Sequence, residues 1–123
     1  MHNKFLPAAV VWGLFVTYAC LAGASSIPKA SWLDIDNKDK IVHFIFHFVF
    51  TILLYKTYKV KVGSSVKAYG YAFLTAAVYG IIIEICQGLF TGERSADVLD
   101  ALANILGSLT AIFMLWLRQR LKK

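Results

Sequence analysis

Four long apolar runs with few charges constrain this chain more than any other feature of its sequence. They cover residues 5–24, 41–55, 68–90 and 101–117. A membrane-spanning helix needs about 20 mostly apolar residues, so the first and third runs are long enough by themselves. The fourth is borderline and the second is short, but snorkelling lysines and a carboxylate in a first helical turn can extend both. We therefore predict four transmembrane helices.

The composition favours a membrane protein over a soluble one. Hydrophobic residues make up 59% of the 123 residues, and the first apolar run carries no charged side chain. A soluble four-helix bundle would need a polar face on every helix. The predicted fold class is all-α, an integral membrane bundle in a single domain of residues 1–123. Its four helices are expected at about residues 5–24, 40–58, 68–90 and 97–117.

Two alternatives concern the first run and the cysteines. A basic start, an apolar stretch and Ala22-Gly23-Ala24 are also typical of a cleaved signal peptide, although we expect a retained helix. Cys20 and Cys86 lie in apolar runs and are expected to be buried small hydrophobic residues. A disulfide between them stays an alternative if the first and third helices run parallel.

The basic residues predict the orientation of the helices. Both termini are expected in the cytoplasm, because most lysines and arginines then lie on the inner side, as the positive-inside rule requires. These inner residues are Lys4, Lys56, Lys59, Lys61, Lys67, Arg118, Arg120, Lys122 and Lys123. They flank the spans rather than line a groove, so no nucleic-acid partner is indicated. The net charge of +6 instead favours contact with anionic membrane lipids.

All seven acidic residues fall at the opposite, outer ends of the predicted helices. They are Asp34, Asp36, Asp39, Glu84, Glu93, Asp97 and Asp100. Several are explained as carboxylates that favour helix N-termini. Glu84 differs, because it lies inside the third run, where a carboxylate costs about 2.5–3.5 kcal/mol. We expect it within direct or one-water reach of His43, Asp100, Asn104 or Arg94, and a purely structural polar clasp stays the alternative.

Helical spacing places polar and small residues on one face of three predicted helices. The faces are His43, His47 and Thr51, then Gly70, Ala77, Gly80, Glu84 and Gln87, then Asp97, Asp100, Asn104, Gly107 and Ala111. Small residues mark the sides on which transmembrane helices approach closely. His43, Glu84 and Asp100 are expected at one depth, one to two turns below the outer boundary. His47 is expected to form an interhelical hydrogen bond.

Three sequence blocks, in this order, resemble those of VanZ-like membrane proteins. They are Asp39-Lys40-x-x-His43, Glu84-x-x-Gln87 and Arg94-x-x-Asp97-x-x-Asp100-x-x-x-Asn104-x-x-Gly107. The resemblance covers about residues 39–115. It implies a small bacterial integral membrane protein from a family named for a member associated with teicoplanin resistance. His47 departs from the resemblance, because an aromatic residue is expected at that position.

The predicted site combines two kinds of chemistry. Lys40 and Arg94, with the outer N-termini of two helices, favour a phosphate or carboxylate. The histidine and carboxylates favour a proton or a divalent cation. No nucleophile motif, phosphate-binding loop or zinc spacing is present, so no motif requires a cofactor. The predicted ligand-binding residues are Asp39, Lys40, His43, Glu84, Gln87, Arg94, Asp97, Asp100 and Asn104.

Three function classes fit such a site in a bacterial cytoplasmic membrane. We expect a cell-envelope protein that binds an anionic lipid-linked cell-wall precursor or lipoglycopeptide and so contributes to tolerance of glycopeptide antibiotics. The first alternative is a membrane enzyme acting on a lipid phosphate or its ester, with His43 as acid/base and Glu84 or Asp100 assisting. The second is a proton- or ion-coupled carrier that uses Glu84.

Overall fold

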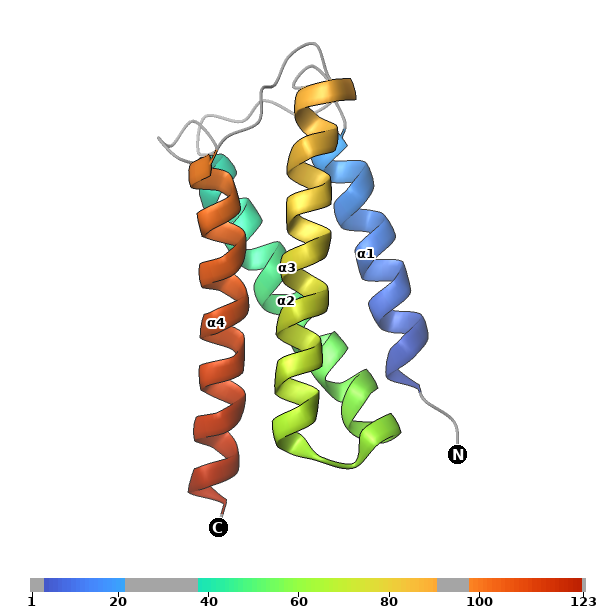
Figure 1. Cartoon of the computed structure of the whole chain (residues 1–123), viewed down its shortest axis with the longest axis vertical. Coiled ribbons are helices and arrows are strands. Elements are labelled where there is room, and N and C mark those ends of the chain that lie inside the picture. The colour runs from blue at the N-terminus through green and yellow to red at the C-terminus, as the bar shows by residue number, and fades with distance from the viewer. Residues whose placement is uncertain (1–3, 22–37, 91–97, 123) are drawn as a thin grey trace.

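Four α-helices run alternately up and down through the structure (Figure 1). This computed structural model describes residues 4–21, 38–90 and 98–122, and at several helix ends it describes the backbone alone. The helices are α1 (Phe5–Leu21), α2 (Lys38–Val62), α3 (Ser65–Phe90) and α4 (Val98–Leu121). The prediction of an all-α fold with four helices is therefore confirmed.

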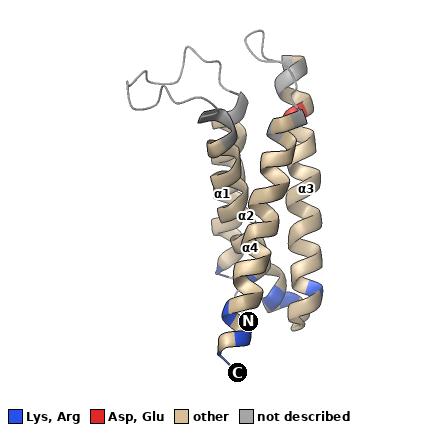
Figure 2. Ribbon diagram, turned by 90° about the vertical axis from the view of Figure 1, so that its left-hand side faces the viewer, with Lys and Arg blue, Asp and Glu red and all other residues tan. Residues whose placement is uncertain are grey.

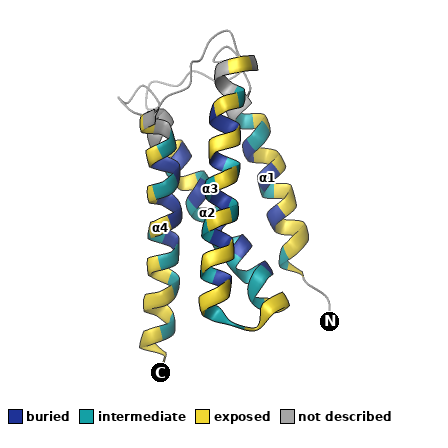
Figure 3. Cartoon of the chain, in the orientation of Figure 1, coloured by how far each residue is buried: buried dark blue, intermediate teal, exposed yellow. Residues whose placement is uncertain are grey.

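The outside of the bundle is apolar on every helix. Large hydrophobic side chains are 53–66% exposed at Leu14, Leu74, Ile82 and Phe113. Polar side chains such as His47 and Thr51 are buried instead, and Figure 3 shows buried and exposed positions alternating along the helices. A soluble monomer does not expose apolar surface on this scale, whereas lipid is a suitable solvent for it. The chain is therefore a membrane protein.

Three of the helices are long and apolar enough to cross a membrane. The candidate spans are Ile41–Val62, Ser65–Cys86 and Ala101–Leu121. The described α1 has 17 residues and is a shorter apolar helix, so the expectation of a full first span is not met within the described part of the chain. The three long spans match the roughly 20 residues that a bilayer core requires.

The turn between α2 and α3 is shorter than the sequence predicted. Gly63 adopts a positive φ of 73°, the left-handed conformation that ends many helices, and its N–H donates to the Lys59 carbonyl at 2.9 Å. Ser64 then caps α3, since its hydroxyl accepts the N–H of Lys67 at 3.3 Å. The two caps allow α2 to continue to Val62 and α3 to begin at Ser65.

The described lysines and arginines gather at the end of the bundle that holds this turn (Figure 2). We call it the basic end. The other end, where α2 and α4 begin and α3 finishes, is called the acidic end, because all seven acids of the sequence lie within six residues of one of these helix termini. The separation agrees with an orientation set by the positive-inside rule.

Hydrogen bonds of Trp12 and Tyr79 anchor the first helix to the bundle. The indole N–H of Trp12 donates to the Phe46 carbonyl of α2 at 3.0 Å. The hydroxyl of Tyr79 on α3 donates to the Gly13 carbonyl at 2.7 Å. Both bonds are worth more inside an apolar bundle than in water, because no water competes there. Below them, apolar residues of α1, α2 and α3 form a small core of Ala9, Phe50, Leu54, Ala72 and Ala76.

Among the described glycines, Gly107 of α4 has the tightest contact with a neighbouring backbone, that of α2. A Cβ added to Gly107 would overlap the carbonyl oxygen of Phe44 and lie 3.1 Å from its carbonyl carbon. Both obstacles are backbone atoms, which side-chain motion cannot move away. Gly107 therefore fixes the spacing of these two helices, as small residues commonly do in membranes.

The buried face of α3 differs from the predicted one. Gly70 is exposed and Ala77 is half-buried, whereas Ala68, Ala72 and Ala76 are fully buried. The buried residues continue at four-residue intervals through Gly80 to Glu84, so α3 packs along an i, i+4 ridge. The predicted face was correct only at its outer half. Cys86 is a free, half-buried thiol, so the disulfide alternative is not formed.

We predict that Gly107→Ala destabilises the folded bundle by about 1–3 kcal/mol, the usual cost of overpacking. The matched control is Gly70→Ala, because no atom lies within 4 Å of a Cβ at that position. Thermal or denaturant unfolding in detergent micelles measures the difference. A Gly107→Ala protein as stable as Gly70→Ala would contradict the close α2–α4 contact.

Candidate functional site

A continuous set of polar side chains is buried between α2, α3 and α4. We call it the polar core. No member is more than 6% exposed. It occupies the half of the bundle toward the acidic end, since α2 and α4 contribute residues from their first four turns. Its members are His43, His47, Thr51, Glu84, Asn104 and Ser108.

Two hydrogen bonds in the polar core join α2 to α4. The Nδ1 atom of His43 lies 3.0 Å from the Oδ1 atom of Asn104, and both residues are 2% exposed. Two turns deeper, the hydroxyl of Thr51 donates to that of Ser108 at 2.8 Å. The first bond fixes the orientation of the imidazole ring. When Nδ1 is the donor, the lone pair of the neutral ring is on Nε2.

Between these two bonds, polar atoms converge on Gly80 of α3. A Cβ at Gly80 would lie 2.8 Å from Nε2 of His47 and 3.1 Å from Nδ2 of Asn104. His47 is completely buried, yet in the described part of the chain neither of its ring nitrogens has a hydrogen-bond partner of ordinary geometry. The expected interhelical hydrogen bond of His47 is therefore wrong, because the ring faces the Cα of a glycine and the rings of Phe50 and Tyr79.

Only one side of the Asn104 amide is hydrogen-bonded among the described residues. Its oxygen contacts His43, but its Nδ2 has no hydrogen-bond partner among the described residues. A buried donor left unpaired costs about 1–3 kcal/mol. Native proteins usually satisfy such donors with water, an ion or a ligand. The polar core therefore contains an unpaired donor group, Nδ2 of Asn104, that lies close to Gly80.

Glu84 lies one turn beyond Gly80 on α3 and is 6% exposed. It therefore faces the interior of the bundle and not the lipid, as the expected site requires. A carboxylate at this depth is stable only when it is protonated or has a partner. Its direct or one-water contact with His43, Asp100, Asn104 or Arg94 remains a prediction.

The remaining predicted site residues fall at the acidic end. Asp39 and Lys40 are in the first turn of α2, Gln87 is in the last turn of α3, and Asp100 is in the first turn of α4. The structure describes these four by their backbone alone. These helix termini lie together at the acidic end of the bundle (Figure 1). Arg94 and Asp97 lie outside the described residues.

The described residues provide no obvious metal site. Among them, no three His, Cys, Asp or Glu side chains are grouped so that they could hold a metal ion. The carboxylates that the sequence suggested for a divalent cation are mostly outside this part of the chain or described by backbone alone. A metal requirement thus has no support from the described geometry.

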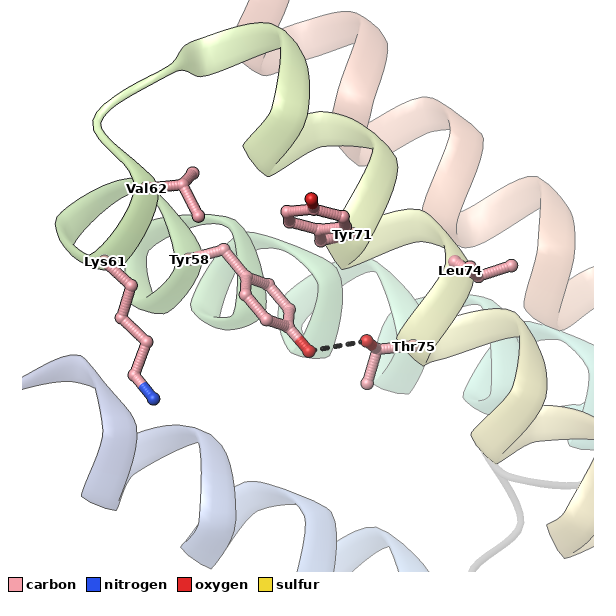
Figure 4. Close-up of a pocket in the computed structure, with 6 residues that line it drawn as sticks. All are labelled: Tyr58, Lys61, Val62, Tyr71, Leu74 and Thr75. Carbon is pink, nitrogen blue, oxygen red and sulfur yellow. Dashed lines mark hydrogen bonds between the residues drawn. The ribbon is translucent and has the colours of Figure 1, made fainter.

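Two cavities of about 300 Å³ each open at the basic end, far from the polar core. One lies between α2 and α3, where the hydroxyls of Tyr58 and Thr75 are 2.7 Å apart (Figure 4). Lys61 is the cation among its lining residues, which also include Tyr71 and Leu74. The other lies between the end of α2, the start of α3 and the end of α4. Neither is lined by a predicted site residue.

Comparison with protein families identifies the chain. The VanZ/LLP1 family model matches residues 5–119. The chain belongs to the VanZ/LLP1 family. Comparisons with curated proteins and with solved structures give no further match. The family match confirms the resemblance seen in the three sequence blocks.

The VanZ family match also extends beyond those blocks, through α1 and as far as residue 119 in α4. The VanZ-like motifs of this chain coincide with the polar core at His43, Glu84 and Asn104, and with the α2–α4 backbone contact at Gly107. Ser108 was missed by the sequence analysis. Its position four residues after Asn104, opposite the polar face of α2, was the signal that could have found it.

We predict that Gly80→Ala destabilises the bundle by about 1–3 kcal/mol, because the new methyl group meets His47 and Asn104. His47→Ala removes the nearer of these obstacles. Gly80→Ala should therefore cost less than half as much in a His47→Ala background. Unfolding free energies of the four proteins in detergent give the coupling. Additive effects of the two substitutions would show that His47 does not face Gly80.

Proposed function

We propose that this VanZ-family protein resides in the bacterial cytoplasmic membrane and binds an anionic lipid-linked molecule at the acidic end of its bundle. The observation that supports it most is the buried Asn104 amide, whose Nδ2 donors have no partner among the described residues. His43 holds the other side of this amide in place. The donors are thus already oriented before a ligand arrives, which lowers the entropic cost of binding.

The surrounding sequence supports an anion as the ligand. Lys40 is in the first turn of α2, where backbone N–H groups and the helix dipole also favour negative charge. Arg94 precedes α4 by four residues and would add a bidentate donor for phosphate or carboxylate. In this proposal the cationic groups bind the charged part of the ligand, and the polar core forms the floor of the site.

A lipid-linked ligand suits the position of the site better than a soluble one. The polar core is enclosed by helices whose outer faces are apolar, so a ligand with a hydrocarbon tail can remain in the bilayer while its polar group contacts the helix ends. A lipid-linked cell-wall precursor or a lipoglycopeptide has this chemistry. Binding either one would change its availability and contribute to glycopeptide tolerance.

A membrane enzyme acting on a lipid phosphate or its ester is the second candidate. The observation that favours it is the 3.0 Å contact of His43 Nδ1 with Asn104, since a general base needs a fixed ring orientation. Turnover of radiolabelled polyprenyl phosphate or phospholipid by the purified protein distinguishes the candidates. Product formation that is lost in His43→Asn would establish the enzyme; binding without turnover favours the first proposal.

We predict that Glu84→Gln and Arg94→Ala each abolish the antibiotic-tolerance phenotype while the protein remains in the membrane. Neither change opens a large apolar cavity, so the fold should persist. Ser64→Ala is the control, because Ser64 lies in the α2–α3 turn at the other end of the bundle. Growth with glycopeptide and immunoblots of membranes measure the two quantities. Full tolerance in Glu84→Gln with reduced protein in Arg94→Ala would instead indicate a structural clasp.

The proposal also requires the acidic end to face outward. We therefore predict that a cysteine at Lys61, in a chain with Cys20 and Cys86 replaced by serine, reacts with an impermeant thiol reagent only after the cells are permeabilised. Lys61 is exposed at the basic end. Labelling in intact cells would show that the protein has the opposite orientation, with the proposed site in the cytoplasm.

A further inference from the structure

The second cavity at the basic end has the properties of an anion site. It measures about 300 Å³ and opens between the end of α2, the start of α3 and the end of α4. Half of its eight lining residues are cationic, which distinguishes it from the cavity beside Tyr58, where Lys61 is the single cation. We call it the basic pocket, and its cationic residues are Lys56, Lys59, Arg118 and Lys122.

No acidic side chain in the neighbouring sequence neutralises these charges. The segments 40–83 and 101–123, which build this end of the bundle, contain no Asp or Glu. The ammonium of Lys59 donates to the neutral carbonyl of Gly63 at 2.7 Å. That of Lys56 lies over the ring of Phe5, 5.2 Å from its centre. The positive charge of the pocket is therefore available to an anion from outside the chain.

Neutral polar groups in the pocket are held by a hydrogen-bond network. The hydroxyl of Tyr69 donates to Oε1 of Gln119 at 2.5 Å, and Nε2 of Gln119 donates to the hydroxyl oxygen of Ser65 at 3.1 Å. Tyr55 stacks on Tyr69 with ring centres 4.9 Å apart and points its hydroxyl at Ser65, at 3.5 Å. Because Ser65 accepts in these contacts, its own proton remains for another acceptor.

The position of the pocket selects the kind of anion. It lies where three membrane-crossing helices end, so it is at the level of lipid headgroups. Leu115 contributes to its wall, and the outer face of α4 beside it is apolar, with Phe113 and Met114 both exposed. A ligand that has a phosphate and hydrocarbon chains would satisfy both surfaces. Basic pockets between transmembrane helices bind anionic headgroups in this way.

We propose that the basic pocket binds the phosphate headgroup of an anionic phospholipid, such as phosphatidylglycerol. The cations neutralise the phosphate, Ser65 donates to one of its oxygens, and the acyl chains lie along α4. This site is at the opposite end from the proposed outer site and does not depend on it. The lipid would hold α2, α3 and α4 together at their basic ends.

The test uses the full chain purified in a neutral detergent. Native mass spectrometry measures how much phosphatidylglycerol and how much phosphatidylcholine stays bound at equal lipid concentration. We expect retention of phosphatidylglycerol to fall roughly tenfold to thirtyfold in Arg118→Gln/Lys122→Gln, because each interfacial cation contributes about 1 kcal/mol. The control is Lys67→Gln/Arg120→Gln, which removes the same charge from the same end but from residues that do not line the pocket.

Several outcomes would overturn the proposal. Equal retention of the two lipids would do so, as would equal losses in the two double variants, since net charge alone would then explain binding. Displacement of the lipid by millimolar inorganic phosphate would identify a free-phosphate site instead. If Arg118→Gln/Lys122→Gln does not fold, the Ser65→Ala variant tests the proposal instead. We expect its phosphatidylglycerol retention to fall severalfold while its melting temperature is unchanged. Unchanged retention in Ser65→Ala would contradict the proposal.

Discussion

The structure depends on one close contact between α2 and α4 inside an apolar surrounding. Gly107 allows the backbones to meet at Phe44, and this spacing brings His43 to Asn104 and Thr51 to Ser108. Lipid provides no hydrophobic force between helices, so packing and interhelical hydrogen bonds must hold the bundle. A larger residue at Gly107 would separate both polar pairs at once. The same contact that stabilises the fold thus positions the candidate site.

The two ends of the bundle carry opposite charges because of how acidic and basic residues are distributed along the sequence. The chain places its acids at one set of helix ends and most of its cations at the other, as orientation in a membrane favours. The polar core is continuous with the acidic end, where Glu84 and Asn104 are buried. At the basic end, cations lie beside cavities and beside neutral groups such as Ser65. In our proposal, the anionic lipid surface that favours such an orientation is also the source of the ligand of the basic pocket.

The sequence predicted the fold well and the site in part. His43, His47 and Thr51 were recognisable because their polar spacing stands out on an apolar helix, and all three are buried. The α3 face was misjudged, since alanines at 68, 72 and 76 are as small as Gly70 and give no contrast in sequence. The network of Tyr55, Ser65 and Gln119 was invisible, because it joins three helices through residues that are individually ordinary at a membrane boundary.

The most direct test of the central claim is a double-mutant cycle on His43→Ala and Asn104→Ala, measured as unfolding free energy in bicelles. The claim that a buried hydrogen bond joins α2 to α4 predicts a favourable coupling of roughly 0.6–1.7 kcal/mol, the range for polar pairs in membrane bundles. The control cycle pairs His43 with Thr110, whose hydroxyl bonds its own helix at Leu106, and should show no coupling. Zero coupling between His43 and Asn104 would contradict the account.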